Sequence, residues 1–304
     1  MKIAIIGAGA MGCLYGSYLA KGRETVTLLD TWQEHTIKIN SAGLSLISSS
    51  DKFVAQPRAT IDANDVGPSD LILICVKATQ TTEAAMLAEL FIKPETIVLS
   101  LQNGLGNLEQ LAEMLGPQRL LVGTTLMGAS VLEPGLVMHS GIKNTHIASW
   151  TGGSDARLST VAAILSRAGL PAVIENNVAS LLWSKLSIHA GLNAVTAITR
   201  ATNRKFLQRP EAVRLARMAV AEVAAVATAA GIPLLYPNCA QEMLSYAESM
   251  QEYQSPMLQD VLHKRKTEID AINGAVILEG RKLGIPTPVN ETLTLTMKTI
   301  ESLY

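Results

Sequence analysis

The stretch "AIIGAGAMG", residues 4–12, decides the fold of this chain. Its glycines Gly7, Gly9 and Gly12 have the G-x-G-x-x-G spacing, which by itself is a weak signal because short glycine patterns recur by chance. The surroundings strengthen it: a β-branched apolar run precedes the glycines, a helical pattern follows over 10–20, and "ETVTLLD" at 24–30 has the composition of a second buried strand. Strand, glycine turn, helix and strand together predict a Rossmann dinucleotide-binding unit.

The glycine turn is the predicted cofactor-binding element. In a Rossmann unit the first glycine permits a tight turn, the second lets backbone N–H groups approach a pyrophosphate, and the third lets helix and strand pack closely. The diphosphate then lies at the positive end of the helix. We therefore assign cofactor binding to the turn and the first helical residues, which are Gly7, Gly9, Ala10, Met11 and Gly12. The alternative is that the glycines form a purely structural turn.

Asp30 ends the second predicted strand and indicates which dinucleotide is bound. A carboxylate at this position accepts hydrogen bonds from the adenosine ribose hydroxyls and repels a 2′-phosphate, for which NADP sites supply an arginine. No lysine or arginine lies between Asp30 and Lys38. The sequence therefore favours NAD(H) over NADP(H). The alternative is that Asp30 only caps a helix that begins at Trp32.

The rest of the chain divides into an α/β part and a helical part. Three further continuous apolar strands alternate with helices, which predicts a doubly wound parallel sheet covered on both faces. These strands are expected at 70–76, 95–101 and 119–125, with helices at 80–91, 106–115 and 154–168 and a hairpin-like pair formed by "GLVMHSG" and "NTHIASW". Beyond Pro171 we expect almost only helices, at 177–200, 210–230, 238–250, 257–283 and 289–303. The predicted domains are 1–170, a dinucleotide-binding Rossmann domain, and 171–304, a helical substrate and catalytic domain.

Composition excludes several classes of function. The formal net charge of −1 gives no support for nucleic acid or an anionic membrane surface as a partner. Three scattered cysteines and five scattered histidines predict no metal site and no disulfide framework, and they fit a reducing cytoplasm. The apolar run from Ile3 to Ala20 imitates a secretory signal, but four glycines interrupt it and its removal would delete the first strand. We therefore expect a cytoplasmic protein with a small-molecule substrate.

A polar stripe runs through an otherwise apolar helical segment at 181–198. Lys185, His189 and Asn193 recur every four residues, which places them along one side of a helix. Their desolvation would be costly unless they face a cleft or each other. A lysine ammonium can donate a proton to a carbonyl oxygen that becomes negative as hydride arrives. The alternative is structural, with Lys185 in solvent and His189 a satisfied core residue.

Seven motifs in order along the chain resemble the ketopantoate reductase (2-dehydropantoate 2-reductase) family over essentially the whole sequence. They are "GAGAMG" (7–12), "VKATQT" (76–81), "QNGLGN" (102–107), "VGTT" (122–125), "LWSKL" (182–186), "MLQD" (257–260) and "TEIDAING" (267–274). The resemblance implies a Rossmann domain followed by a helical domain, with the active site between them. It also implies reduction of the 2-oxo group of ketopantoate to D-pantoate, a step of pantothenate synthesis.

The resemblance also implies roles for individual residues. Lys185 would be the general acid and Glu268 its acidic partner, while Asn103 would lie beside both nicotinamide and substrate. Lys77, at the end of its strand, would contact the cofactor, and the substrate-binding set would be Asn103, His189, Asn193 and Ser255. Loop structure, with Asn103 as a helix cap, is the alternative for Lys77 and Asn103.

Three departures from the family pattern leave the substrate open. The family usually has asparagine at position 189, a serine at position 256 where this chain has Pro256, and in many members an arginine near Asp30. These differences resemble an NAD-using branch, the D-2-hydroxyacid dehydrogenases that act on other branched or aromatic 2-oxo acids. A non-catalytic dinucleotide sensor is a further alternative, but a sensor needs neither Lys185 nor Glu268. The sequence allows a homodimer and does not fix the direction of reaction.

Overall fold

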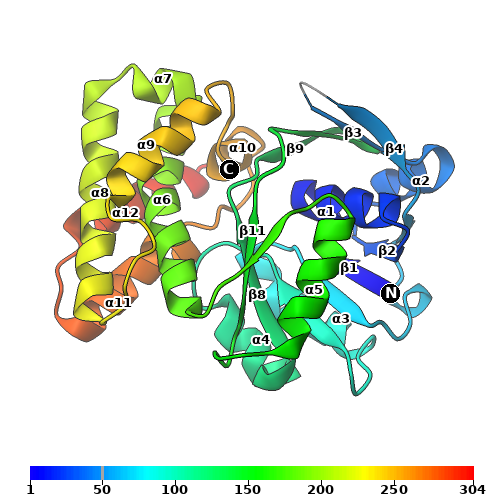
Figure 1. Ribbon diagram of the computed structural model, residues 1–304. Helices are drawn as coiled ribbons and strands as arrows, with labels where there is room; N and C mark the ends of the chain where they lie inside the picture. Colours follow the sequence, from blue (N-terminus) through cyan, green and yellow to red (C-terminus); the bar gives the residue numbers. More distant parts are fainter. Residues whose placement is uncertain (49–50) are drawn as a thin grey trace. The chain divides into compact units, whose positions relative to one another are not determined.

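The computed structural model describes residues 1–48 and 51–304 (Figure 1). The chain forms two compact units. The first comprises Met1–Gln102 and Asn107–Val178, and the second comprises Asn103–Gly106 and Ala179–Tyr304. The first unit extends to Val178, past the expected division at residue 170, because the strand Ala172–Ile174 pairs within its sheet. The expected fold class, an α/β domain followed by a helical region, is confirmed.

An eight-stranded sheet forms the centre of the first unit, in the order β12-β11-β8-β7-β6-β1-β2-β5. Every pairing in it is parallel except that of β11 with β8. The strands are β1 (Lys2–Ile6), β2 (Thr25–Leu29), β5 (Arg58–Thr60), β6 (Leu71–Ile74), β7 (Ile97–Ser100), β8 (Leu120–Thr125), β11 (Thr145–Ser149) and β12 (Ala172–Ile174). The order reverses at β1, as in doubly wound dinucleotide-binding folds.

Alternate side chains of the strands pack into two separate cores, which is why these strands are apolar throughout. Ile3, Ile5 and Leu28 point toward α1 and α5, whereas Ala4 and Ile6 point toward α3 and α4. The helices of this unit are α1 (Ala10–Lys21), α2 (Gln33–Ala42), α3 (Thr81–Glu89), α4 (Asn107–Leu115) and α5 (Ala156–Arg167), with short 3₁₀ turns η1 (Ala63–Asp65), η2 (Ala78–Gln80) and η3 (Pro117–Arg119). In this unit, α1 packs against β1, and α5 packs against β11 and β12 (Figure 1).

A second, four-stranded sheet in the order β4-β3-β10-β9 covers the other side of α1. Its strands are β3 (Leu44–Ile47), β4 (Lys52–Ala55), β9 (Ala129–Glu133) and β10 (Leu136–His139). The expected hairpin between "GLVMHSG" and "NTHIASW" is therefore wrong. β10 pairs with β9 and β3, while β11 pairs with β8 and β12. Both segments have strand character, but only long-range packing on α1 or on the large sheet selects their partners.

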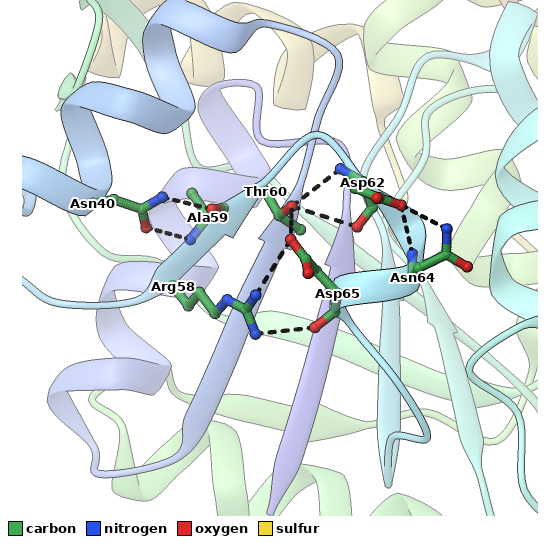
Figure 2. A network of polar contacts seen from close by, with 7 residues as sticks. All are labelled: Asn40, Arg58, Ala59, Thr60, Asp62, Asn64 and Asp65. Atoms are coloured by element: carbon green, nitrogen blue, oxygen red, sulfur yellow. Dashed lines mark hydrogen bonds and ion pairs between the residues drawn. The ribbon is translucent and has the colours of Figure 1, made fainter.

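Edge strand β5 is fixed by side chains of the following turn (Figure 2). The Arg58 guanidinium lies 3.3 Å from the Asp65 carboxylate, and the Thr60 hydroxyl donates to the same carboxylate at 2.8 Å. The Asn40 amide both donates to and accepts from the Ala59 backbone. These contacts fix β5 to α2. They also pair Arg58, the basic residue of β5, with Asp65.

The second unit is helical. Its helices are α6 (Val178–Thr199, of which Val178 is counted with the first unit), α7 (Asn203–Leu207), α8 (Pro210–Ala229), α9 (Cys239–Ser249), α10 (Pro256–Leu262), α11 (Ala275–Leu283) and α12 (Pro288–Glu301). The expected continuous helix at 257–283 is wrong. α10 ends before Lys264, whose φ of 52° leaves the helical region, and a π-helical turn, η4 (Asp270–Gly274), precedes α11.

Candidate functional site

The glycine turn has the geometry that its spacing predicts. Gly7 adopts a φ of 96°, and a Cβ there would lie 2.9 Å from the backbone nitrogen of Val76. A Cβ on Gly12 would lie only 1.9 Å from the carbonyl oxygen of Gly7. The first glycine is thus required by backbone conformation and close approach, and the third by the contact between helix and turn.

Gly9 differs from the other two: apart from Gly9 itself and its chain neighbours, no atom of residues 1–48 and 51–304 lies within 4 Å of the position that its Cβ would occupy. It is the N-cap residue of α1, supplies no side-chain cap, and is followed by no acidic residue in the first turn. The first N–H groups of a helix have no intrahelical partners, and the helix dipole favours an anion there. The space at Gly9 lies at the N-terminus of α1, whose first residues are Ala10 and Met11, and this is where the sequence predicts the dinucleotide diphosphate.

Asp30 lies beside this turn and not on the following helix. One carboxylate oxygen accepts from the Ala8 N–H at 2.6 Å and the other from the Trp32 N–H at 3.0 Å. The Asp30 side chain does not cap α2, whose N-cap residue is Trp32. A carboxylate can accept about four hydrogen bonds, so Asp30 can still accept from ribose hydroxyls.

Behind the turn lies a buried contact that the sequence analysis missed. The Cys13 thiol donates to the Ala8 carbonyl at 3.0 Å and contacts Nε2 of His35 at 3.2 Å. The Gly135 N–H donates to Nδ1 of His35, and burial lowers the pKa of this imidazole. The glycine turn is thereby linked to the loop between β9 and β10. No sequence spacing relates these residues.

Lys77 follows β6 and is the N-cap residue of η2. Its backbone carbonyl accepts from the Gln80 N–H at 2.9 Å and from the Gln102 side chain at 3.5 Å. The residue therefore lies at the carboxyl end of the parallel strands, where ligands of open α/β sheets bind.

The polar stripe is present on α6, within the second unit. His189 and Asn193 are buried, and Lys185 is partly buried. Burial lowers the pKa of Lys185 to about 8, although the charge of Glu268 opposes this shift. Burial and the Lys185 charge lower the pKa of His189 to about 3, so His189 is neutral at physiological pH. Within residues 1–48 and 51–304 the side chains of His189 and Asn193 form no hydrogen bond with protein, so their polar atoms are available to a ligand.

Glu268 and Asn103 lie together in the same unit. Glu268 is buried, and the Asn103 side-chain amide donates to its carboxylate at 3.3 Å. The Leu105 N–H donates to the Ala271 carbonyl at 2.9 Å, which holds the loop against η4. Gly104 makes this approach possible: its φ is 85°, and a Cβ would lie 2.3 Å from the Ala271 oxygen. The "QNGLGN" motif contains Gly104, but its spacing alone does not indicate this role.

Ser255 already has two intramolecular partners. Its hydroxyl accepts from the Leu258 N–H at 3.2 Å as the N-cap of α10 and lies 2.8 Å from the Thr196 hydroxyl. Thr196, one turn beyond Asn193 on α6, was not among the predicted site residues. Pro256 is the first residue of α10, a position where proline is favoured.

Replacing Lys185 with methionine is expected to raise the melting temperature. Its pKa is about 8 in the folded protein and about 10.5 unfolded, so the charged form opposes folding. This penalty is complete below pH 8 and disappears as the pH rises from 8 to above 10.5. Thermal unfolding at pH 6.5 and pH 10.5 checks this. A gain from Lys185→Met that does not shrink at the higher pH would contradict it.

The described residues contain neither a candidate membrane-spanning helix nor a candidate metal site. No helix within residues 1–48 and 51–304 is both long enough and apolar enough to cross a membrane. In the same ranges, no three histidine, cysteine, aspartate or glutamate side chains are grouped as a metal site would require.

Known proteins resemble this chain over its full length. A structure of a PanE/ApbA family ketopantoate reductase from Ralstonia eutropha is 33% identical, with a TM-score of 0.90, and covers 100% of this chain and 99% of its own. D-mandelate dehydrogenase, solved with NADH and anilino(oxo)acetate, is 29% identical, with a TM-score of 0.94 and the same coverage. The 2-dehydropantoate 2-reductase of Halobacterium salinarum is 33% identical over 294 residues, 96% of each chain.

Two family models match consecutive parts of the sequence. The model described as Ketopantoate reductase PanE/ApbA matches residues 3–152, and the model of its C terminal part matches residues 177–301. Together they include the glycine turn, the α6 stripe and Glu268. With this coverage and the relatives above, the chain belongs to the ketopantoate reductase PanE/ApbA family of NAD(P)-dependent oxidoreductases.

Proposed function

We propose that the protein reduces the 2-oxo group of ketopantoate to D-pantoate, with Lys185 as the general acid. The observation that carries this proposal is the placement of Lys185 on α6, where its pKa is about 8 and the charge of Glu268 opposes loss of its proton. A general acid is most effective when its pKa lies near the working pH. The family membership supports the reaction class.

Each residue of the candidate site would have a separate role in this reaction. When bound, a reduced nicotinamide cofactor would supply the hydride for the carbonyl carbon. The ammonium of Lys185 donates a proton to the carbonyl oxygen as negative charge develops there. Glu268 favours the charged form of Lys185 and is oriented by the Asn103 amide. Asn193 and neutral His189 offer polar atoms for the remaining groups of the substrate.

We assign the dinucleotide as NAD(H). The Asp30 carboxylate is fixed at the glycine turn by two backbone N–H groups, and a 2′-phosphate beside it would meet a like charge. Arg58, the basic residue of neighbouring strand β5, is paired with Asp65 and so does not offset this charge.

Replacing Asp30 with alanine is expected to lower the preference for NADH over NADPH by about tenfold or more, because one repulsive charge and one ribose acceptor are removed. The measurement is kcat/KM for NADH and NADPH at saturating 2-oxo acid. Glu113→Ala is the control, because it removes an exposed carboxylate of α4 in the same unit and leaves the Arg58–Asp65 pair intact. A wild-type enzyme that already prefers NADPH would contradict the assignment.

The test of the proposed reaction is steady-state oxidation of NADH, and in parallel of NADPH, with ketopantoate as substrate. Loss of reduced-nicotinamide absorbance with efficient turnover is the expected result. Protein that binds a dinucleotide but does not turn over ketopantoate would contradict the ketopantoate assignment.

A second candidate is an NAD-dependent D-2-hydroxyacid dehydrogenase for another branched or aromatic 2-oxo acid. Specific observations favour it: position 189 holds a buried neutral imidazole, Pro256 has no hydroxyl, and the Ser255 hydroxyl is already bonded to Thr196 and Leu258. The structural similarity of this chain to D-mandelate dehydrogenase supports this candidate. The discriminating assay compares ketopantoate with a phenyl-substituted 2-oxo acid, and His189→Asn is expected to shift the preference toward ketopantoate.

A further inference from the structure

The π-helical turn η4 carries a buried amide that the proposed reaction does not use. Asn273 is fully buried, and its side-chain NH₂ group donates to two acceptors on two other helices. One is the Ala190 carbonyl on α6 at 3.0 Å, and the other is the Asn290 side-chain oxygen on α12 at 2.9 Å. Ala190 is the residue after His189, which belongs to the polar stripe. Asn273 thus connects the turn after Glu268 with the helix that carries Lys185.

Asn290 continues the connection to α8. It is also fully buried, and its NH₂ group donates to the Ala219 carbonyl at 3.1 Å and to the Glu222 carboxylate at 2.7 Å. Glu222 also accepts from the backbone N–H groups of Val289 and Asn290, at 2.8 and 2.9 Å. Hydrogen bonds to an ionised group are stronger than neutral ones, so Glu222 fixes the orientation of the Asn290 amide.

Glu268 is held through the same turn. The Ile272 N–H donates to the Glu268 carbonyl at 3.1 Å, and the Gly274 N–H donates to the Ile269 carbonyl at 2.9 Å in the i→i+5 pattern of a π-helix. On the other side of Glu268, the Thr267 backbone and hydroxyl both donate to Glu301. Isolated π-turns occur often at functional sites, because the extra residue redirects the side chains around it.

We propose that Asn273, oriented by Asn290 and Glu222, is a positioning residue that sets the placement of Glu268 relative to Lys185. Asn273 fixes the turn to α6 at Ala190, so a change there moves Glu268 and the Ala271 carbonyl that receives the 103–106 loop. This inference rests on the proposed roles of Lys185 and Glu268, and it adds a group that contacts neither substrate nor cofactor.

Asn273→Ala removes both hydrogen-bond donors of the side chain. It is expected to reduce kcat by roughly 10-fold to 100-fold, because a displaced catalytic group slows the chemical step, with little change in the KM for the dinucleotide. The alkaline limb of kcat/KM moves to lower pH, because Glu268 supports the protonated Lys185 less well. Val226→Ala is the matched control: Val226 is a fully buried residue of α8, one turn from Glu222. Its loss destabilises the unit without breaking the amide connection, so the pH profile stays that of the wild type.

Glu222→Gln keeps the shape of the side chain and provides a second test if the Asn273→Ala protein does not fold. It is expected to move the pH profile in the same direction by a smaller amount. Identical pH profiles for the wild type, Asn273→Ala and Glu222→Gln would overturn the proposal, and so would an equal shift in Val226→Ala.

Hydrogen exchange of the same proteins needs no turnover and separates this inference from the proposed function. Asn273→Ala is expected to accelerate exchange of the Leu105, Ile272 and Gly274 amides beyond the change seen in Val226→Ala. Accelerated exchange in a protein that reduces no 2-oxo acid would preserve the positioning role and overturn the proposed reaction. Unchanged exchange at these amides would overturn the positioning role.

Discussion

Replacing Lys185 with alanine is expected to reduce turnover by about 10²-fold or more while dinucleotide affinity stays the same. Lys185 lies on α6 in the second unit, whereas the predicted diphosphate site is the glycine turn of the first. Loss of the proton donor therefore affects the chemical step and not cofactor binding. Steady-state oxidation of reduced dinucleotide gives kcat, and titration of protein fluorescence gives the dinucleotide Kd.

The matched control is Lys282→Ala. Lys282 is exposed on α11 and paired with Glu279, so its loss removes the same charge from a surface position. Wild-type kinetics are expected for this variant. Unchanged turnover in Lys185→Ala would remove Lys185 from the mechanism.

The pH dependence of the wild-type enzyme tests the same residue without a mutation. A general acid must be protonated, so kcat/KM for reduction is expected to fall as the pH rises through about 8, the pKa of Lys185. Glu268→Gln removes the charge that supports the ammonium, so the same limb should move to lower pH. A profile that stays flat to pH 10 would exclude a proton donor with this pKa.

Gly9→Ala is expected to weaken dinucleotide binding by at least about 10²-fold without lowering the melting temperature. Gly9 has a φ of −68°, which alanine adopts readily, and nothing within 4 Å would meet the added methyl group. The methyl group would instead occupy the space predicted for the diphosphate, where close approach of the backbone N–H groups is needed. Dinucleotide titration and thermal unfolding of the same preparation test both parts.

Comparison of Gly9→Ala with Gly12→Ala distinguishes an effect on dinucleotide binding from an effect on folding. A Cβ on residue 12 would lie 1.9 Å from the Gly7 carbonyl oxygen, so in Gly12→Ala the turn must rearrange, and both melting temperature and dinucleotide affinity should fall. If Gly9→Ala bound the dinucleotide as tightly as the wild type, the space at Gly9 would not be the diphosphate site.

Local patterns in the sequence predict much of this architecture. The alternation of apolar strands with helices predicts the large sheet, because strands buried on both faces must be apolar throughout. Glycine spacing predicts the turn at residues 7–12, because Gly7 and Gly12 lie where a side chain would collide with the backbone. The four-residue period of Lys185, His189 and Asn193 predicts their common face on α6, because helical geometry depends only on local spacing.

Local sequence patterns are therefore sufficient to predict the Rossmann unit and the helical second part, and they also supply most of the residues proposed for the candidate site. The pairing of β10 with β3 and of β11 with β8 could be seen only in the tertiary structure, because each pairing joins strands that other elements separate in the chain. The tertiary structure alone brought Asn103 to Glu268, by way of the Gly104 contact with Ala271. It also decided that the Ser255 hydroxyl bonds to Thr196 and Leu258. The contacts of Thr196 with Ser255, Asn103 with Glu268 and Gly104 with Ala271 join residues 59 to 167 positions apart, so no local periodicity predicts them. The contact of Ser255 with Leu258 depends on the residue at which α10 begins.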